Sequence, residues 1–488
     1  MIAQQPIPTP DLTFAPLLPE LVLAVVGIAG MLYEAIARRP DRGTHLTLGL
    51  IGVITATVVT VPLWSWTGET TVLAGTITAD RFSVMARLVL LAVAAIGLVY
   101  GTHALGRQGG ETHGEFYPLV LFATMGMTLI TAAADLIVVF LALEILSLSL
   151  YVLTGITGRQ GATEAAMKYF LLGAFSSAFF LYGVAMAYGA ANSTKIVEVA
   201  NALAGRTGSQ ALALVAIAFL AIGFGFKVSA APFHMWTPDV YQGAPTPVTA
   251  FMSAATKVAA FMALIRVFMV AFQPLAWDWM PIIWGLAAVS VVVGSILAIA
   301  QTDVKRMLAY SSVAHAGFIL TGLTAADSTG VRAALFYLVA YAAMTLGSFG
   351  VVMLVASRGV ERTTLGSYAG LWRRSPALAA MMTIFLLSLA GIPPSAGFVA
   401  KVNVFGAAIG AGHWPLVLLG VIASVAAAFF YLRVIVLMFM QEPAEDFELD
   451  PAPVVGVAVA LPAIVTVVLG IVPGLVSGPI EQAAVLRW

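Results

Sequence analysis

The sequence predicts an all-α polytopic membrane protein. Residues of the set AVILMFWYC make up 61% of the 488-residue chain, whereas Asp, Glu, Lys and Arg together make up only 9%. The mean hydropathy is +0.99, which is well above the usual range of soluble domains. Apolar stretches of about 20 residues recur along the chain, and none has the alternating pattern of a membrane β-barrel strand. These observations favour helices that cross a lipid bilayer.

Fourteen segments are apolar and long enough to span the bilayer as helices. They begin near Leu17, His45, Phe82, Tyr117, Asp135, Glu164, Ala211, Val248, Pro281, Arg306, Val331, Pro376, Trp414 and Val454. The first residues lack the basic region of a cleavable signal peptide, so we expect the first span to be retained. The connections are short apart from an acidic run, EPAEDFELDPAP, before the last span. No soluble domain is expected.

Basic residues in the connections predict the orientation of the chain. With fourteen spans both termini lie on one side, and the connections after odd-numbered spans carry more Lys and Arg. These connections contain Arg38, Arg39, Arg42, Arg159, Lys305, Arg306, Arg358, Arg362, Arg373 and Arg374. Because basic connections stay cytoplasmic, both termini are predicted on the non-cytoplasmic side of the cell inner (plasma) membrane.

Four charged residues interrupt the apolar segments: Glu144, Lys227, Lys257 and Lys401. An ionisable group at the bilayer centre costs roughly 2.5–3.5 kcal/mol, so each needs a partner, water or a function. Glu144 lies about 13 Å into its span at 1.5 Å per residue. Lys257 is similarly deep and has no evident acidic partner in the sequence. We infer that these residues move protons, with a structural ion pair as the alternative for Glu144.

Two spans are predicted to be broken, and each contains one of these lysines. Pro232 follows Lys227 by five residues, and Pro393 and Pro394 precede Lys401. Proline removes a backbone donor, so an interrupted helix survives at membrane depth only where protein or a water-filled cavity satisfies its backbone. Paired interrupted helices are typical of internally repeated transporters with their ion path at the break. An ordinary proline kink is the alternative.

Energies of the right size favour proton transfer by an ion pair that opens and closes. Burial favours the neutral form of an amine, whereas a nearby carboxylate favours its charged form. Two charges 4 Å apart interact by about 4 kcal/mol at an effective dielectric of 20. Moving one charge against 100 mV takes about 2.3 kcal/mol. The free energy of making or breaking one ion pair is therefore on the right scale to move one proton.

Two of the six histidines, His234 and His315, lie in or beside apolar segments and are candidate members of the relay. A hydrogen-bonded structural histidine is the alternative for each. No two histidines have the spacing of a metal site, so no metal ion is expected. The chain has no Cys and a formal net charge of zero, which excludes thiol chemistry and cysteine-ligated clusters and gives no basic surface for nucleic acid.

The stretches that carry these charges resemble a known family. They are KVSAAPFHMWTPDVYQGAPTPVTAFMSAATK, DVKRMLAYSSVAHAGF, LEILSLSLYVLTG and GIPPSAGFVAK. They are similar to the antiporter-like membrane subunits of the proton-pumping NADH:quinone oxidoreductase, respiratory complex I, and the resemblance covers nearly the whole chain. The run around Glu144, the chain length and the lysine at position 401 resemble the subunit N group among the three antiporter-like subunits.

The resemblance implies a fold of about fourteen transmembrane helices with two inverted five-helix repeats, spans 4–8 and 9–13, and with broken helices 7 and 12. The implied regions are residues 1–110 with the first three spans, 111–275 with the first repeat, 276–442 with the second repeat, and 443–488 with the acidic loop and last span.

The resemblance also implies roles for the buried charges. Glu144 would pair with Lys227, and Lys257 would lie centrally. His315 would link the two halves, and Lys401 would pass protons towards the outside. Flavin, iron–sulfur clusters and quinone would belong to other subunits, so this chain would hold no cofactor. Its partners would be the neighbouring antiporter-like subunit, small membrane subunits and lipid.

Two other functions fit parts of the sequence. A subunit of an Mrp-type cation/proton antiporter would share the lysines and the broken helices, and the run around Glu144 is the feature against it. A purely structural membrane anchor would tolerate neutralisation of all four buried charges. Co-purification with an NADH-oxidising assembly separates the first alternative from complex I.

Overall fold

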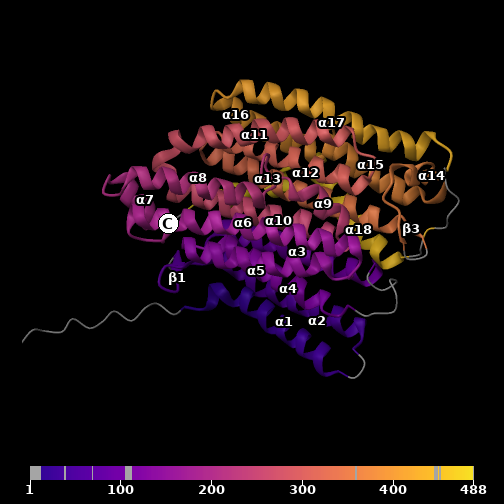
Figure 1. The fold of residues 1–488 in the computed structure, drawn as a ribbon, viewed down its shortest axis with the longest axis horizontal. Coiled ribbons are helices and arrows are strands. Elements are labelled where there is room, and N and C mark those ends of the chain that lie inside the picture. The colour runs from indigo at the N-terminus through magenta and orange to yellow at the C-terminus, as the bar shows by residue number, and fades with distance from the viewer. Residues whose placement is uncertain are drawn as a thin grey trace, which may run out of the picture.

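The chain folds into one bundle of helices, most of which lie side by side with their axes along its longest dimension (Figure 1). This computed structural model describes residues 13–37, 40–68, 70–104, 113–357, 360–443, 449 and 452–486. Three basic residues used to predict orientation, Arg38, Arg39 and Arg358, lie outside the described residues. So do the first twelve residues and most of the acidic run EPAEDFELDPAP.

Each apolar segment singled out in the sequence overlaps one helix or, for the twelfth, two helices. The first seven are α1 (Leu18–Ile36), α2 (Arg42–Thr60), α3 (Arg81–Ala104), α4 (Phe116–Ala132), α5 (Leu136–Gly155), α6 (Gln160–Ala191) and α8 (Gln210–Lys227). The others are α10 (Thr246–Arg266), α11 (Ala276–Ile299), α12 (Val304–Leu323), α13 (Ser328–Leu354), α15 (Pro376–Ala390) with α16 (Ala396–Gly410), α17 (Trp414–Met440) and α18 (Pro453–Ile471).

Eleven helical segments among the described residues are long and apolar enough to cross a membrane: α1, α2, α3, α5, α6, α8, α10, α11, α13, α17 and α18. Three further helices, α4, α15 and α16, are apolar but shorter. The chain is therefore a multi-pass helical membrane protein, as the sequence predicts.

Several helices begin at a short polar side chain that accepts a backbone N–H. Asp135, Asp303 and Asp327 cap α5, α12 and α13, and Ser209 and Ser395 cap α8 and α16. Such caps satisfy donors that have no partner in the first helical turn. They explain why these helices begin where the apolar segments begin.

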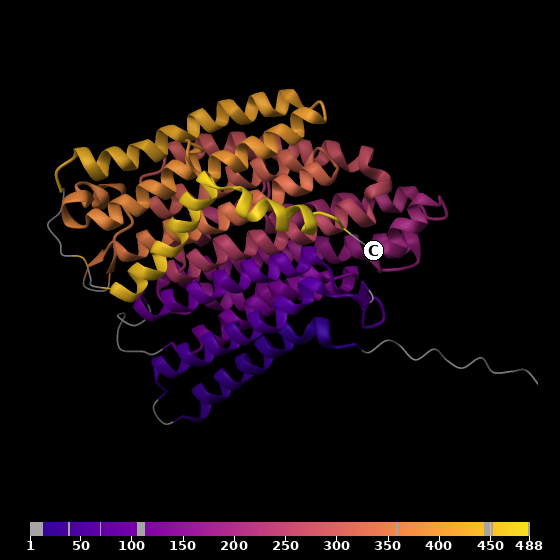
Figure 2. The same ribbon diagram turned by 180° about the vertical axis from the view of Figure 1, so that it is seen from behind.

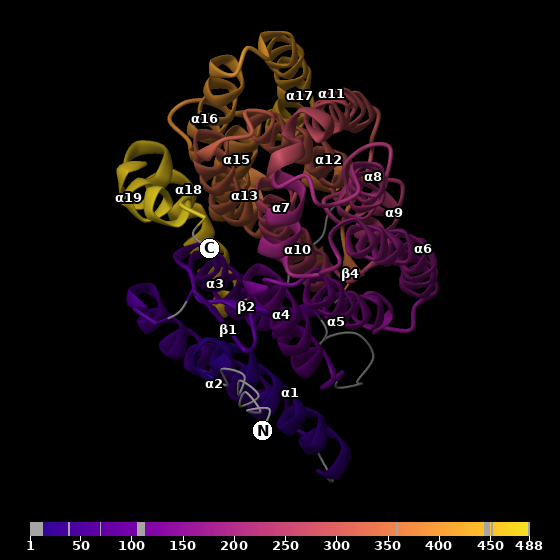
Figure 3. The same cartoon turned by 90° about the vertical axis from the view of Figure 1, so that its left-hand side faces the viewer.

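The centre of the bundle is formed by α10 and α13. In their most apolar windows 94% and 89% of the residues are buried, against 33% in α1, α2 and α17. The view along the helices shows α10 and α13 inside, with α1 and α2 at one edge and α17 at the opposite edge (Figure 3). From behind, α18 runs obliquely across the bundle and continues into α19 (Gly474–Ala483) (Figure 2). A residue on α10 is therefore far from lipid.

The two predicted helix breaks are confirmed. A turn that contains Pro232 separates α8 from the short helix α9 (Trp236–Gly243), and Pro393 and Pro394 separate α15 from α16. The peptide bonds Ala231–Pro232 and Pro393–Pro394 are cis.

Two β-hairpins were not expected from the sequence. Strands β1 (Thr71–Val72) and β2 (Ile77–Thr78) pair antiparallel between α2 and α3. Strands β3 (Ala356–Ser357) and β4 (Val360–Glu361) pair antiparallel after α13. The short helices α7 (Ile196–Ala204) and α14 (Leu371–Arg374) also lie in connections. Each of these elements is too short to give a periodic pattern in the sequence.

Two buried ion pairs join the N-terminal helices to the bundle, and sequence analysis identified neither. Arg266 of α10 donates to both oxygens of Asp80 at 2.9 and 3.0 Å. Arg87 of α3 donates from Nε to Glu20 of α1 at 2.9 Å. All four residues are at most 7% exposed. Their charges lie near the ends of apolar segments, where sequence alone predicts contact with water.

We expect Arg266→Met to destabilise the protein by about 3–5 kcal/mol, because it leaves the buried Asp80 carboxylate without its guanidinium. The midpoint of thermal inactivation of the detergent-solubilised assembly measures this effect. The double variant Asp80→Asn with Arg266→Met is the control, since it removes both charges and should recover much of the loss. Equal midpoints for the single and double variants would contradict a role for the unpaired charge.

Candidate functional site

Lys227, Lys257 and Lys401 are all buried inside the bundle, with 3%, 1% and 5% of their surface exposed. None of the three has a carboxylate oxygen within 4.0 Å in the described part of the chain. Hydroxyl groups, backbone carbonyls and aromatic rings surround their ammonium groups instead. A buried amine with such partners is not locked in an ion pair, so it can exchange its proton.

Lys227 is the last residue of α8, and its ammonium faces α5 and α6. Nζ donates to Ser147 Oγ at 2.6 Å. The centres of the Tyr151, Tyr169 and Phe226 rings lie 5.7, 5.7 and 5.9 Å from Nζ. Aromatic faces attract a cation and partly replace its lost hydration.

Glu144 lies on α5 three residues before Ser147 and accepts a hydrogen bond from Ser177 of α6. The direct Glu144–Lys227 pair that the family resemblance implies is not present in this structure. Residues three apart lie on one face of a helix, so Glu144 and Ser147 are neighbours on α5. The ammonium of Lys227 contacts Ser147 and not Glu144.

Lys257 of α10 donates a hydrogen bond to a backbone carbonyl at the break that follows α8. Its Nζ donates to Val228 O at 2.8 Å and to Ser312 O of α12 at 2.7 Å. In a continuous helix the Val228 carbonyl would accept the N–H of residue 232, but Pro232 has none. The ammonium of Lys257 therefore replaces a backbone donor that the proline removes.

Lys401 of α16 donates to a backbone carbonyl at the second break in the same way. Its Nζ donates to Ala390 O at 2.8 Å and to Ser424 Oγ at 2.6 Å. The Ala390 carbonyl would accept the N–H of residue 394 in a continuous helix, and Pro394 has none. The sequence links Lys227 to the first break because it is nearest, whereas Lys257 is the lysine whose ammonium satisfies it.

His315 lies on α12 between the two breaks. Its Nδ1 is 2.7 Å from Tyr337 Oη and its Nε2 is 3.3 Å from Tyr431 Oη. The Tyr431 hydroxyl also bonds Ser311, which precedes the residue whose carbonyl Lys257 contacts. In the other direction, Phe318 of α12 packs its ring against the ammonium of Lys401 at 4.8 Å. One face of α12 therefore connects the surroundings of Lys257 and Lys401.

His234 lies in the turn between α8 and α9, where it is half-buried. Its ring centre is 6.4 Å from that of Tyr310, and no described hydrogen bond joins it to a buried lysine. The structure brings His315 together with the lysines but leaves His234 to one side of them.

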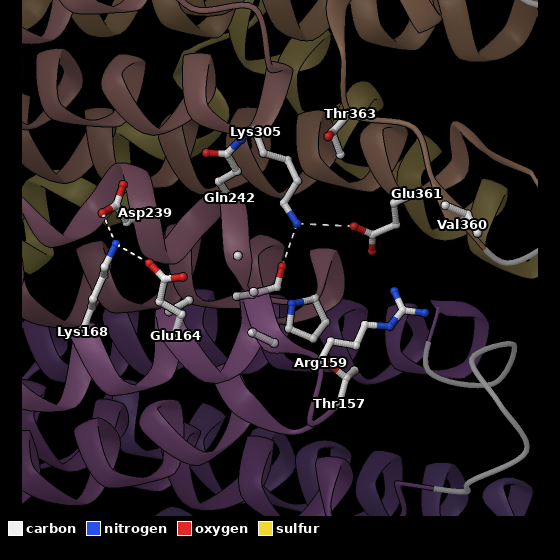
Figure 4. A pocket seen from close by; sticks show the side chains of 16 residues that line it. Thr157, Arg159, Glu164, Lys168, Asp239, Gln242, Lys305, Val360, Glu361 and Thr363 are labelled. Atoms are coloured by element: carbon white, nitrogen blue, oxygen red, sulfur yellow. Dashed lines mark hydrogen bonds and ion pairs between the residues drawn. The ribbon is translucent and has the colours of Figure 1, made fainter.

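A cavity of about 490 Å³ lies at the end of the bundle that carries β3 and β4. Figure 4 shows Lys305 between Gln242 and Glu361, with Lys168, Glu164 and Asp239 to the left, beyond Gln242. Lys305 Nζ donates to Ala244 O at 2.6 Å and lies 3.3 Å from Glu361 Oε2.

The walls of this cavity come from both halves of the chain. Lys168 of α6 lies 2.8 Å from Glu164 and 2.9 Å from Asp239, and Arg306 of α12 donates to Asp239 at 2.7 Å. Sequence analysis did not include these residues in the site. The four-residue spacing of Glu164 and Lys168 was a usable signal for one pair, but the other contacts join residues distant in sequence.

Glu361 lies in the connection after α13 and favours its ionised form. Burial alone would raise the pKa of its carboxyl group. Lys305 and the hydrogen bonds donated by Thr246 outweigh burial and hold the pKa of Glu361 below its ordinary value. The Glu361 carboxylate is therefore charged at neutral pH.

The fold and the buried lysines together define an antiporter-like membrane subunit. The family model described as "NADH:quinone oxidoreductase/Mrp antiporter, TM" matches residues 133–427. Proteins named NADH-quinone oxidoreductase subunit N from Rhodococcus opacus and Acidothermus cellulolyticus are each 46% identical to the chain. The matches cover 98% and 96% of this chain and 97% and 95% of the relatives. The chain therefore belongs to this family, within the group of N subunits.

Solved structures agree with this assignment. A chain of respiratory complex I from Thermus thermophilus with bound aureothin is 35% identical, with a TM-score of 0.80, and the match covers 95% of this chain and 99% of that chain. A chain of the Mrp complex from Dietzia sp. is 22% identical with a TM-score of 0.85, over 97% of both chains. The second likeness concerns the fold alone.

Proposed function

We propose that this chain is the proton-translocating N subunit of an NADH:quinone oxidoreductase, and that Glu144, Lys227, Lys257, His315 and Lys401 carry the protons. The observation that carries the proposal is a set of three buried lysines. Within the described ranges none of them is paired with a carboxylate, and two of them bind carbonyls at the helix breaks. His234 lies beside this path, where it would act at most as a peripheral member.

The proposed relay has two halves. In the first, closing the Glu144–Lys227 pair stabilises the charged amine, and opening it, as in this structure, favours proton release towards Lys257. In the second, the hydroxyls of Ser311, Tyr431 and Tyr337 around His315 lead towards Lys401. Hydroxyl groups both donate and accept, so they can pass a proton without becoming charged for long.

The proposed membrane arrangement has fourteen spans. Eleven of these spans are the long apolar segments. The other three are α4, α12, and the pair α15 and α16, and this pair forms one broken span. Residues 111–275 and 276–442 form the two inverted repeats, preceded by residues 1–110 and followed by 443–488. Both termini lie on the non-cytoplasmic side of the plasma membrane, so the cavity near Glu361 is cytoplasmic.

The redox steps belong to partner subunits, which hold the flavin, iron–sulfur clusters and quinone. This chain serves the translocase activity without a redox centre of its own. The neighbouring antiporter-like subunit and small membrane subunits contact it. An Mrp-type antiporter has weaker support, because the relatives of about 45% identity carry the name of subunit N whereas the Mrp likeness is at 22%.

We expect Glu144→Ala in the assembled complex to lower coupled proton transfer while leaving assembly largely intact. The physical reason is that Lys227 loses the carboxylate that stabilises its protonated form. Inside-out vesicles report the effect through a pH-sensitive dye during NADH oxidation. Glu198→Ala is the matched control, because Glu198 is half-exposed on α7 and pairs only with neighbours in sequence. Full pumping by assembled Glu144→Ala would contradict the proposed pair.

A further inference from the structure

Helix α10 carries a row of hydroxyl groups although it is buried on every side. Thr246, Thr249, Ser253 and Thr256 are 0%, 0%, 0% and 3% exposed. Steps of three, four and three residues place them within about 100° of the helix circumference, and the next residue, Lys257, lies on the same face. The Thr249 hydroxyl donates to Tyr241 O at 3.0 Å and the Ser253 hydroxyl donates to Ala250 O at 3.1 Å. A hydroxyl that donates to a carbonyl still has lone pairs that can accept a proton.

The row begins at the cavity described above. Thr246 donates to Glu361 from its backbone N at 3.1 Å and from Oγ1 at 2.5 Å. Within the described ranges, Glu361 is the one carboxylate that both lines this cavity and bonds α10. Its side chain is 18% exposed, so it contacts the cavity and the helix at the same time.

The row ends at Lys257, eleven residues from Thr246 and therefore about 16 Å along the helix. Three hydroxyls near this end have no hydrogen-bond partner within 3.5 Å among the described residues: Thr256 Oγ1, Ser312 Oγ and Tyr341 Oη. The Ser312 carbonyl bonds Lys257, and the Tyr341 ring centre lies 5.8 Å from its Nζ. Buried hydroxyls without protein partners are usually satisfied by water, and one water can bridge hydroxyls a turn apart.

We propose that Glu361 takes up protons from the cytoplasmic cavity and that the α10 hydroxyl row passes them to Lys257. This inference rests on the proposed function and adds the route of uptake. The carboxylate gains a proton from water, and at each step one O–H bond breaks as the next forms. The last step forms an N–H bond on the neutral amine of Lys257, so one proton moves and no other reactant is needed.

The charged and titratable groups around Glu361 come from several elements. They are Lys305, Arg306 and Asp303 at the start of α12, Arg159, Glu164 and Lys168 at the start of α6, Asp239 of α9, Arg362 beside it and Tyr368 after it. The competing interpretation is that Glu361 only anchors the first turn of α10, where a carboxylate is favourable. A test must therefore separate proton uptake from anchoring.

Glu361→Gln tests this, because the amide oxygen still accepts from Thr246 but cannot carry a proton. The variant also removes the charge opposite Lys305, so pumping is divided by the amount of assembled complex. In inside-out vesicles the medium sets the cytoplasmic pH, and pumping is followed with a dye during NADH oxidation. We expect a loss on the order of tenfold or more across the working pH range, because Glu361, whose pKa lies below its ordinary value, is ionised throughout that range. Glu361→Asp should restore much of the rate, and Glu442→Gln, an exposed glutamate paired with Arg373, is the control.

Ser253→Ala tests the row itself, because it removes one hydroxyl with little change in volume. It should also lower pumping. Thr466→Val should not, because Thr466 lies on α18, outside the row, although its hydroxyl is bonded to its own helix as that of Ser253 is. A wild-type rate and pH profile for Glu361→Gln, or a wild-type rate for Ser253→Ala, would overturn the proposed route. If either occurs while Lys257→Met is inactive, the uptake route is wrong and the proposed function stands.

Discussion

A complex that carries Lys257→Met is expected to assemble, to oxidise NADH and to lose most of its proton translocation. Lys257 is the central lysine, 1% exposed, and it lies where the α10 hydroxyl row meets the first helix break. Methionine keeps a long flexible side chain of similar volume but has no proton to exchange. We expect a loss on the order of 10²-fold in transfer through this chain, the lower end of what a positioned proton-transfer group contributes.

Lys257→Arg separates proton exchange from structure. Arginine keeps donors for the Val228 and Ser312 carbonyls but does not deprotonate in proteins. If the lysine carries protons, the Arg and Met variants should both fail to support coupled quinone reduction, measured as the NADH-dependent rate in sealed vesicles. Normal coupled rates in Lys257→Arg would mean that binding the two carbonyls is the whole role of the residue.

The second large effect is expected at Lys401. Lys401→Ala removes the donor to Ala390 O and Ser424 Oγ, and Lys401→Arg keeps the charge without a titrating amine. Both variants should impair pumping in an assembled complex, because the last step towards the outside needs a group that releases its proton. The dye response in inside-out vesicles, divided by the amount of assembled complex, measures this loss.

The two Lys401 variants also separate two kinds of failure. The alanine variant leaves the Ala390 carbonyl with only the longer hydrogen bond from Ser424 Oγ at 3.3 Å, which can loosen the break. The arginine variant avoids that loss. If Lys401→Arg pumps normally, Lys401 is a fixed charge at the break, and the relay is confined to the first half of the chain.

The helices could be predicted because an apolar segment inside a bilayer must satisfy its backbone hydrogen bonds internally, and a helix does so. The breaks at Pro232 and Pro394 could be predicted because proline removes a donor in either case. The lysine that donates to the carbonyl at the first break could not be predicted. Lys227 is closer to this break in sequence, but Lys257, which makes the contact, lies on α10. Contacts between elements decide this, and spacing along the chain does not contain them.

The residues that surround the proposed relay could not be predicted from the sequence for a related reason. Tyr337 and Tyr431 have the pattern of ordinary core aromatics, and only their distances to His315 distinguish them. Glu361 lies in a connection that gives no periodic signal, and its importance depends on packing against α10. The buried pair of Asp80 and Arg266 joins residues 186 positions apart. Single-sequence reasoning can find such charges, but it cannot pair them.

The number of protons moved per electron in the Lys257→Met complex tests the central claim most directly. NADH oxidation and proton release are recorded together in sealed inside-out vesicles, with Lys195→Met, at a half-exposed surface lysine, as the control. The account predicts a lower ratio in Lys257→Met than in the wild type and an unchanged ratio in the control. A wild-type ratio in an assembled Lys257→Met complex would show that protons do not pass through this lysine, and would leave the chain as a scaffold.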